Sequence, residues 1–428
     1  MTIWDRYTQD ERESYIEYLK IYGALSGLFN QKASTTGAPY LDSKFQETVY
    51  AKSFNSEGVD IGNTPHDIKS VFGSESVGIG IKTWLSSKPS FQKVMQLKKY
   101  KNTIDKFNDP STSDQLAYKI SEIKNERLMF DYKRLGLKQD GNVYHYVTRD
   151  TGLLTLNETS YPLVDINNLV PGNLTNKSFN FSDGQKEYKY TFGDSQIWMK
   201  FEETQKDTSI LDKIPVSLID DSFLFLKNAY NNYTSDNGIL VSRQVTPDYL
   251  YLPLYSYRSK TVPESSGLNA WNGKPKTSGS TTLRPRGEAY IPIPTSVWKK
   301  KPYWVDPKVD MRHYNKYKQD TGKSSYEINL HLPDGTIFPA LFGQTGFKAL
   351  ETNPQSILGI WILNVLGITN PQRVKYDQSA INVVTMDSLE LLGVDSVKLW
   401  HQDPNNLKEV WIDFAELGSF EEFMNDEL

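Results

Sequence analysis

The most informative stretch of the chain for its architecture is Ser266–Pro294, which reads SGLNAWNGKPKTSGSTTLRPRGEAYIPIP. It is polar and interrupted by glycines, it contains Arg284 and Arg286, and it leads directly into the alternating sequence Ala289–Ile293. Hydrogen-bonding side chains on an exposed segment beside a rigid strand are the arrangement with which proteins contact base edges in DNA. A second polar segment, Gln344–Pro354, follows further along the chain. The two segments together predict a recognition clamp with two arms.

The sequence around these arms predicts a mainly-β domain. Ser325–Leu332 and Thr336–Leu341 flank the turn Pro333-Asp334-Gly335, where glycine supplies the positive φ that a tight hairpin needs. Ser396–Trp400 and Glu409–Phe414 are expected to pair across a polar turn. Several short strands with few helices indicate a small barrel or pseudobarrel. Short helices are expected at 354–365 and 388–392.

The N-terminal half mixes helices with strands. Apolar residues recur at steps of three and four within Tyr15–Phe29, which predicts a helix, and Val77–Trp84 predicts a compact strand. From Val143 onward short alternating runs dominate, and Asp183-Gly184 between two of them predicts a hairpin. Further helices are expected at 45–54, 91–100 and 112–135.

The length of 428 residues exceeds what one hydrophobic core usually organises, so it favours two domains. We expect the first at 1–245, with a core at about 40–135 and a β-rich extension at about 140–205. The second is expected at 246–428. An α+β fold class follows, with an α/β core ahead of a mainly-β pseudobarrel.

The amino-acid composition limits the kinds of catalytic and metal-binding site that the chain can form. The chain has no cysteine, which excludes disulfides, thiolate zinc sites and thiol catalysis and fits a reducing cytoplasm. It has neither a signal-peptide pattern nor a run of about 18 apolar residues, so we expect a cytoplasmic protein without a membrane partner. The net charge is only −4, but Lys82–Lys101 contains six lysines and no acid, and Arg284–Lys323 contains ten basic residues against four acidic ones. These basic regions favour a polyanionic partner.

Asp67 and Lys82 are the first candidates for a catalytic pair. Mg²⁺-dependent cleavage of a phosphodiester needs carboxylate oxygens that hold the cation and a lysine that stabilises the attacking water or the developing negative charge. Two adjacent strands can supply both groups at one place. Lys82 also opens the acid-free lysine run, beside which a phosphate backbone could lie.

The second carboxylate of this arrangement is not in its usual position. Two residues before Lys82, on the same face of the strand, the chain has Gly80, so the acid has to come from elsewhere, with Glu47 and Glu75 as candidates. In an alternative arrangement, Asp60 is the first acid and Asp67-Ile68-Lys69 provides the acid-x-lysine pair. The candidate catalytic residues are Asp67, Lys82 and Glu47, and the candidate metal ligands are Asp67 and Glu47, ahead of Asp60 and Glu75.

The two arms contain residue types that read bases. Arginine contacts guanine with two hydrogen bonds, asparagine contacts adenine, and glutamate accepts from cytosine N4. A plainer interpretation of SGLNAWN is an ordered loop that packs Trp271. The candidate DNA-binding residues are Ser266, Asn269, Trp271, Asn272, Arg284, Arg286 and Glu288 in the first arm, and Gln344, Lys348 and Asn353 in the second.

Four separated motifs carry a family resemblance, namely VPESSGLNAWN, RPRGEAYIPIP, LPDG and QTGFKALETNPQSILGIWIL. Over residues 250 to 415 the chain resembles the DNA-binding pseudobarrel at the C-terminus of certain bacterial type II restriction endonucleases. That domain is akin to the one in plant auxin-response transcription factors. The resemblance implies two arms that grip the major groove of DNA, formed by the residues named above apart from Asn272.

The N-terminal sequences HDIKSVFGSESVGIGIKTWL and SFQKVMQL are similar to the catalytic core of restriction endonucleases with the PD-(D/E)xK fold. This resemblance implies that Asp67 is a metal ligand and Lys82 the catalytic lysine, and Gly80 departs from the pattern. We therefore expect a Mg²⁺-dependent type II restriction endonuclease that cuts double-stranded DNA. Cutting two strands usually needs two active sites, so a homodimer is expected. The alternative is a catalytically inactive, sequence-specific DNA-binding protein with a nuclease-like domain.

Overall fold

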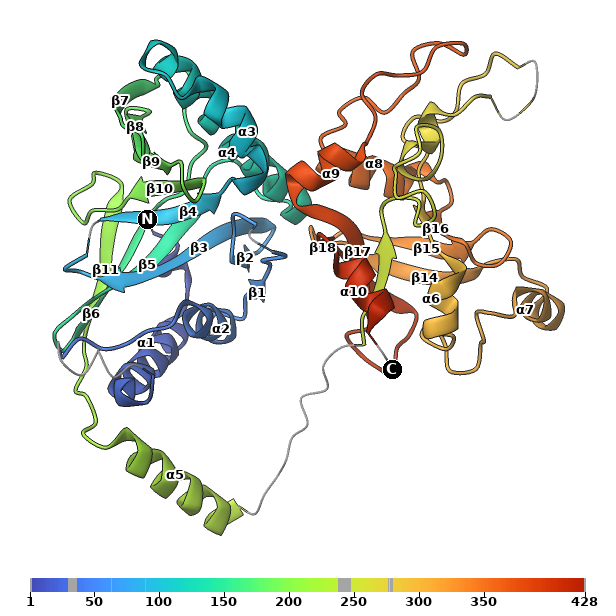
Figure 1. Ribbon diagram of the computed structural model, residues 1–428. Helices are drawn as coiled ribbons and strands as arrows, with labels where there is room; N and C mark the ends of the chain where they lie inside the picture. Colours follow the sequence, from blue (N-terminus) through green and yellow to red (C-terminus); the bar gives the residue numbers. More distant parts are fainter. Residues whose placement is uncertain are drawn as a thin grey trace. The chain divides into compact units, whose positions relative to one another are not determined.

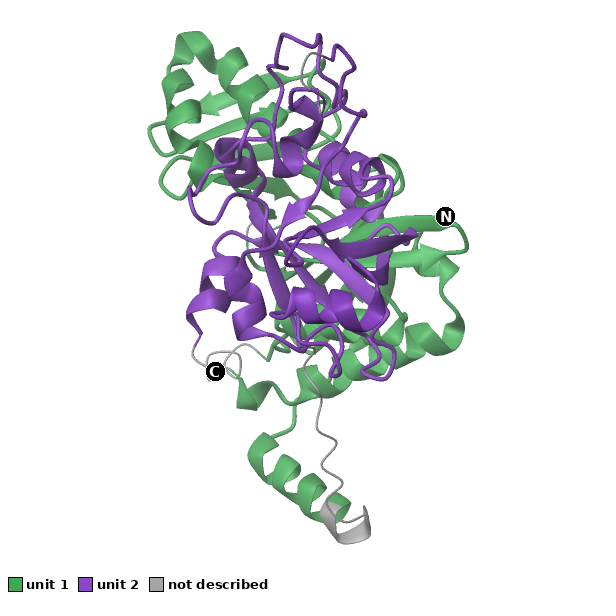
Figure 2. Ribbon diagram, turned by 90° about the vertical axis from the view of Figure 1, so that its right-hand side faces the viewer, with its two compact units in different colours: residues 1–132, 137–244 green, residues 133–136, 245–428 purple. Residues whose placement is uncertain are grey.

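The protein folds into two compact units with both helices and strands (Figures 1 and 2). A computed structural model describes residues 2–29, 37–62, 64–88, 90–237, 248–275, 277 and 280–426. Unit 1 comprises 1–132 and 137–244, and unit 2 comprises 133–136 and 245–428. The fold class is α+β. Among the described residues, no helix has the length and apolar character that crossing a membrane requires.

Unit 1 contains two sheets. β3 and β5 in the larger sheet are parallel, and its other neighbouring strands are antiparallel. The larger sheet has the order β1 (Glu57–Gly58), β2 (Ile68–Phe72), β3 (Glu75–Leu85), β5 (Val143–Asp150), β6 (Leu153–Ser160) and β11 (Thr208–Pro215). The smaller, antiparallel sheet has the order β4 (Phe91–Gln96), β10 (Gln196–Lys200), β9 (Glu187–Thr191), β8 (Ser178–Ser182) and β7 (Val170–Leu174). The helices are α1 (Gln9–Ala24), α2 (Ser43–Ser53), α3 (Lys101–Ile104), α4 (Ser113–Leu135, whose end groups with unit 2) and α5 (Ser222–Asn237).

Helices α1 and α2 cover one face of the larger sheet (Figure 1). A capping box between Thr8 and Glu11 starts α1, and Asp42 caps α2 by accepting a hydrogen bond from the backbone of Phe45. Ile79 and Ile81 of β3 point into the core beneath these helices, because alternate strand residues share a face. Gly80 and Lys82, which alternate with them along the strand, therefore face the other side of the sheet, toward Tyr144.

The structure confirms most of the expected elements of unit 1. α2, β3 and α4 lie where the sequence placed them, and β8 and β9 form the Asp183-Gly184 hairpin with Gly184 at φ +81°. The expected helix at 91–100 is wrong, because Phe91–Gln96 forms β4 and pairs with β10. Phe91, Val94 and Met95 have helical spacing, but pairing with a strand about a hundred residues away overrides this local pattern.

Unit 2 is built around one seven-stranded sheet whose end strands, β12 and β13, contact each other, so the sheet is a nearly closed barrel. β14 and β18 are parallel, and the other neighbouring strands are antiparallel. The strand order is β12 (Leu250–Pro253), β17 (Val394–Trp400), β18 (Glu409–Glu416), β14 (Tyr326–His331), β15 (Ile337–Gly343), β16 (Ala349–Thr352) and β13 (Ile291–Pro292). The helices are α6 (Thr295–Lys300), α7 (Tyr314–Thr321), α8 (Ser356–Val365), α9 (Met386–Leu392) and α10 (Ser419–Asn425).

Unit 2 confirms both expected strand pairs. β14 and β15 form a hairpin around Pro333-Asp334-Gly335, with Gly335 at φ +92°, and β17 pairs with β18. The helices expected at 354–365 and 388–392 are also present, as α8 and α9.

Candidate functional site

Asp67 and Lys82 meet at one end of the β2–β3 hairpin in unit 1. Lys82 Nζ lies 3.7 Å from Asp67 Oδ2, and both side chains are accessible, at 24% and 15% of their surface. The backbone N–H of Ile81 donates to the same Asp67 oxygen at 2.6 Å, and Lys82 Nζ donates to the Ile81 carbonyl at 2.8 Å. The hairpin backbone thus holds the carboxylate and the amine in one orientation.

Helix α2 brings Glu47 to the same site. Burial raises the pKa of Glu47, and the negative charges of Asp67 and Asp60 raise it further, against the lowering effect of Lys44. Glu47 is therefore a carboxylate whose charge is influenced by two neighbouring acids. Lys44 Nζ lies 2.7 Å from Glu47 Oε2 and 3.6 Å from Asp60 Oδ2, so one cation bridges these two carboxylates.

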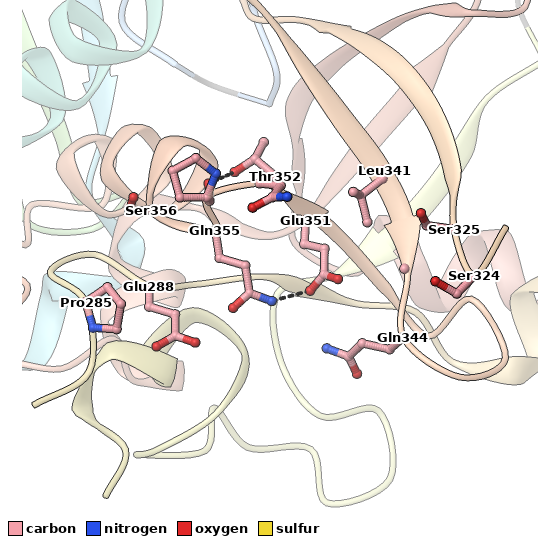
Figure 3. A pocket seen from close by; sticks show the side chains of 13 residues that line it. Pro285, Glu288, Ser324, Ser325, Leu341, Gln344, Glu351, Thr352, Gln355 and Ser356 are labelled. Carbon is pink, nitrogen blue, oxygen red and sulfur yellow. Dashed lines mark hydrogen bonds between the residues drawn. The ribbon is translucent and has the colours of Figure 1, made fainter. Parts of the chain in front are cut away.

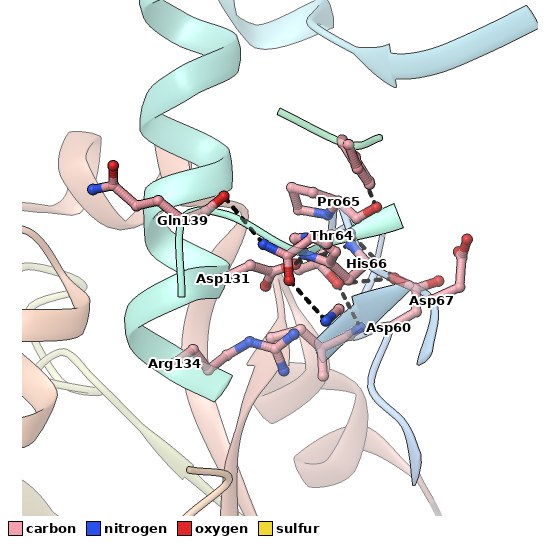
Figure 4. Close-up of polar contacts among 12 residues, drawn as sticks. Asp60, Thr64, Pro65, His66, Asp67, Asp131, Arg134 and Gln139 are labelled. Atoms are coloured by element: carbon pink, nitrogen blue, oxygen red, sulfur yellow. Dashed lines mark hydrogen bonds and ion pairs between the residues drawn. The ribbon is translucent and has the colours of Figure 1, made fainter. Parts of the chain in front are cut away.

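Asp60 has a structural task in this cluster. Its Oδ1 accepts hydrogen bonds from the backbone N–H groups of Gly62 and Thr64, at 3.1 Å each, and from the Thr64 hydroxyl at 3.2 Å (Figure 4). These contacts shape the loop that leads to Asp67. Asp60 is therefore less free to bind a cation than Glu47 or Asp67.

Glu75 is not part of the cluster. It lies at the start of β3, seven residues from Lys82 near the other end of the strand, and pairs with Arg6 at 2.9 Å and Lys138 at 3.4 Å. Lys69, the lysine of the alternative arrangement, is buried in β2 with only 3% of its surface exposed. The structure thus brings together Asp67, Lys82 and Glu47 and separates Glu75 from them.

The side chains around Gly80 explain its departure from the acidic pattern. Gly80 pairs with Tyr144 of β5, and a Cβ on Gly80 would lie 2.7 Å from the Tyr144 ring and 3.1 Å from that of Tyr161. These two rings stack with centroids 3.7 Å apart. They fill the space that an acidic side chain at position 80 would need.

A buried histidine anchors the loop in front of Asp67. His66 Nδ1 lies 3.1 Å from Asp131 Oδ2 of α4, and the His66 backbone N–H donates to the same oxygen at 3.0 Å (Figure 4). Both side chains are fully buried. The hydroxyl of Tyr161 also donates to the carbonyl of Pro65 at 3.0 Å. Sequence reasoning missed Asp131, since no local pattern links residues 65 positions apart.

The candidate metal ligands Asp67 and Glu47 can be compared with what Mg²⁺ requires of its ligands. Within the described ranges no group of three or more histidine or acidic side chains has the geometry of a metal site. Asp67 and Glu47 each use one carboxylate oxygen in the contacts above, and for the other oxygen no hydrogen bond is found among the described residues. Mg²⁺ commonly binds one or two carboxylates and completes its shell with water and substrate phosphate, so the donor set suits this ion.

In unit 2, the first part of the first arm is a structural element. Asn269 is fully buried: its Nδ2 donates to the carbonyls of Pro263 and Val384 at 3.0 and 2.8 Å, and its Oδ1 accepts from the Val384 backbone. Asn272 is also buried and uses both ends of its amide, toward Glu264 and Ala380. Their expected contact with bases is therefore not available in this conformation.

Trp271 follows the plainer interpretation of its segment. It lies in the 3₁₀ segment η7 (Gly267–Asn272), and its side chain is fully buried. The expectation of a base contact by Trp271 does not fit this burial. Its physical role is to fill the interior beneath the arm, because burial of an aromatic side chain contributes strongly to packing.

The two arginines of the first arm differ in whether their side chains are available to bind a ligand. Arg284 donates from Nε to the Lys274 carbonyl at 2.9 Å and from a terminal nitrogen to Glu288 at 3.2 Å, and Glu288 is almost fully buried. Arg286 is exposed, and no hydrogen bond or ion pair to it is found within the described part of the chain. Arg286 is thus a cation of this arm that is available to a ligand.

The remaining arm residues line two pockets, each on the surface of unit 2. The first pocket has a volume of about 460 Å³ and includes Glu288, Gln344 and Asn353 (Figure 3). The second has a volume of about 490 Å³ and includes Ser266, Gln344 and Lys348. Gln344, at φ +58° in a turn, lines both pockets.

The structure adds residues that sequence reasoning did not select. Lys44 beside Glu47 carried a detectable signal, because a lysine three residues before a glutamate on a helix forms a local pair. Glu351 in the first pocket carried none, since its orientation depends on contacts made after folding. No protein-family model matches this chain, and no curated protein matches it.

Proposed function

We propose that this protein is a Mg²⁺-dependent, sequence-specific endonuclease, in which unit 1 hydrolyses double-stranded DNA and unit 2 binds it. The observation that carries the proposal is the convergence of Lys82, Asp67 and Glu47. A lysine 3.7 Å from one carboxylate, with a second carboxylate electrostatically coupled to the first, is the donor set that phosphodiester hydrolysis needs.

Each residue has a distinct task in this reaction. Glu47 and Asp67 would hold Mg²⁺, which neutralises charge on the scissile phosphate. Lys82 orients the attacking water and stabilises the negative charge that develops on phosphorus-bound oxygen. The bond from water oxygen to phosphorus forms in line as the bond to the 3′ oxygen breaks. The attacking water loses a proton to solvent, the departing 3′ oxygen takes a proton from solvent, and the products are a 5′-phosphate and a 3′-hydroxyl.

Unit 2 supplies the DNA contacts in this proposal. Arg286 and Lys348 are exposed cations on the two arms, and Arg258 adds a third at the second pocket. Exposed arginine and lysine attract the phosphate backbone and place the arms on the duplex. We further propose that two copies act together, because each active site cuts one strand. The absence of cysteine supports a cytoplasmic location.

The second candidate is a DNA-binding protein that does not cut. The aromatic rings against Gly80 favour it, because they occupy the place of the second carboxylate in the resembling nucleases. Incubation of purified protein with unmethylated phage DNA and Mg²⁺ separates the two functions. Discrete fragments support the endonuclease, whereas gel shifts without cleavage under varied divalent cations support the binder.

The test of the catalytic assignment is Lys82→Ala. Loss of the amine should slow cleavage by about 100-fold or more, since charge stabilisation of this kind contributes several kcal/mol. DNA affinity measured in Ca²⁺ should stay unchanged. The matched control is Lys88→Ala, which removes an exposed lysine just beyond β3. Full activity of the Lys82 variant would refute the assignment.

A further inference from the structure

The two pockets of unit 2 have opposite electrostatic character. The first contains two carboxylates, Glu288 and Glu351, and no lysine, arginine or histidine among its lining residues. The second contains two cations, Arg258 and Lys348, and no carboxylate. Gln344 lines both pockets, so the charge of the lining residues changes from negative to positive across a single side chain. A polyanion that covers both pockets must place different chemical groups in each.

Glu288 and Glu351 are not equivalent within the first pocket. Arg284 pairs with Glu288 at 3.2 Å and offsets its charge. Among the described residues Glu351 has no ion pair, and its one hydrogen-bond partner is the side-chain amide of Gln355, which donates to Oε2. Glu351 therefore keeps its negative charge uncompensated at a surface where the proposed ligand is an anion.

The position of the Glu351 carboxylate is set by its surroundings. A Cβ on Gly343 would lie 2.3 Å from Glu351 Oε1, so the carboxylate oxygen rests directly against a glycine in the neighbouring strand. Gln355, at the start of α8, holds the other oxygen (Figure 3). Oε1 is thus an oriented acceptor for which no hydrogen bond is found within the described part of the chain.

We infer that Glu351 Oε1 accepts a hydrogen bond from the exocyclic amino group of a DNA base, while Arg258 and Lys348 hold a backbone phosphate in the second pocket. The inference rests on the proposed DNA binding by unit 2. A carboxylate repels phosphate, and among the groups in the major groove it is matched by the amino groups of cytosine and adenine. Guanine and thymine offer keto oxygens there, which would repel it. Glu351 therefore selects adenine or cytosine over guanine or thymine on the strand that it faces.

The experiment starts from the full-length protein in Ca²⁺, which is used to prevent cleavage. Selection from a randomised duplex library identifies the bound sequence. Each adenine or cytosine in that sequence is then replaced by purine or 2-pyrimidinone, the analogues without the amino group. We expect about a tenfold or greater loss of affinity at one position for the unaltered protein. Glu351→Met, which has a similar length but no carboxylate or amide acceptor, should bind the amino-bearing and amino-free duplexes with nearly equal affinity at that position.

Three variants serve as comparisons. Glu327→Gln changes an exposed glutamate on β14 that does not line the pocket, and it should keep the full preference. Lys348→Gln should weaken binding to all duplexes and reduce the salt dependence of affinity, with the base preference unchanged. Gln355→Ala keeps the Glu351 charge but releases its orientation, so it should reduce the preference and provides a second test if Glu351→Met does not fold.

The outcomes separate the inference from the function on which it rests. If no duplex is selected from the library, the proposed DNA binding itself fails. If a duplex is selected but Glu351→Met keeps the same amino-group dependence at every position, the assignment of Glu351 is overturned. A uniform loss of affinity in Glu351→Met, without a change at one position, would also overturn it, because that result indicates a structural role.

Discussion

At the scale of single residues, Gly80 determines which residues can form the proposed catalytic cluster. A strand residue two positions before Lys82 shares its face, and an acid there would be the simplest second ligand. The Tyr144 ring takes that space, and the Lys82 amine lies 5.9 Å from the centre of this ring. In the proposed site the second carboxylate is instead that of Glu47, from helix α2.

We expect Gly80→Ala to lower the free energy of unfolding by about 1–3 kcal/mol, because it inserts a methyl group into a filled space. Gly80→Glu should lower it further and should not increase cleavage. Urea denaturation measures both effects. Gly58→Ala is the matched control, since nothing lies within 4 Å of the added Cβ. Equal urea midpoints for Gly80→Ala and the unaltered protein would contradict the packing argument.

Glu47 should show opposite effects on stability and on activity. Burial raises its pKa above the ordinary value of 4.5, and the charges of Asp67 and Asp60 add to this. A raised carboxylate pKa gives stability that is present below about pH 4.5 and is lost as pH rises through the raised value. At pH 7 ionised Glu47 therefore opposes folding, and Glu47→Gln should unfold at an equal or higher temperature.

The same Glu47→Gln variant should lose cleavage by about 100-fold or more, since it removes a proposed metal ligand. Mg²⁺ should raise the melting temperature of the unaltered protein more than that of the variant. Scanning calorimetry with and without Mg²⁺, together with a plasmid cleavage assay, measures both. A marked fall in melting temperature at pH 7 would show that the Glu47–Lys44 pair outweighs the burial cost.

At the scale of elements, α4 buries a lysine within unit 1. Lys124 is 1% exposed, and its amine lies 5.7 Å and 5.6 Å from the ring centres of Tyr161 and Tyr188. Burial lowers the pKa of Lys124 to about 8, against the opposing effect of Asp183. The amine is thus held in a setting that disfavours its charged form.

We expect the free energy of unfolding to rise with pH between about 8 and 10.5 because of Lys124. In that range the unfolded chain binds the proton and the folded chain does not. The lowering of about 2.5 pKa units corresponds to roughly 3 kcal/mol. Lys124→Met should remove this rise and stabilise the protein at pH 7.5. Urea titrations at pH 7.5 and 9.5 test it, with Lys119→Met on the same helix as control; parallel profiles for Lys124→Met and the unaltered protein would argue against it.

At the scale of the whole molecule, binding and cleavage are assigned to different units. Changes in unit 2 should therefore alter affinity without changing the chemistry at Lys82. This separation can be measured, because binding in Ca²⁺ and single-turnover cleavage in Mg²⁺ report on different units.

Arg286→Ala should weaken binding to the selected duplex by about 1–3 kcal/mol, the range for loss of a good arginine contact to a base. Fluorescence anisotropy in Ca²⁺ measures the change. At saturating protein the single-turnover cleavage rate should be unaltered. Arg312→Ala is the control, since Arg312 is engaged with Asp310 at 2.6 Å. An unchanged affinity and site preference for Arg286→Ala would argue against the first arm as a DNA contact.

Local sequence patterns determined much of the architecture. The hairpin turns at Asp183-Gly184 and Pro333-Asp334-Gly335, the helix α4 and the strand β3 follow from turn chemistry and side-chain period, which act between close neighbours. The proximity of Asp67 and Lys82 could also be predicted from the sequence, because adjacent antiparallel strands have a simple register.

Only the tertiary structure decided the features that depend on distant partners. β4 is a strand because β10 pairs with it. Position 80 has no room for an acidic side chain because the ring of Tyr144 lies opposite. Asn269 and Trp271 have the residue types that read bases, but the amide of Asn269 is hydrogen-bonded inside unit 2 and the ring of Trp271 is buried there. A polar side chain can bind a ligand at the surface or form hydrogen bonds in the protein interior. Which of the two it does depends on the neighbours that it acquires on folding, and the residue type alone does not determine those neighbours.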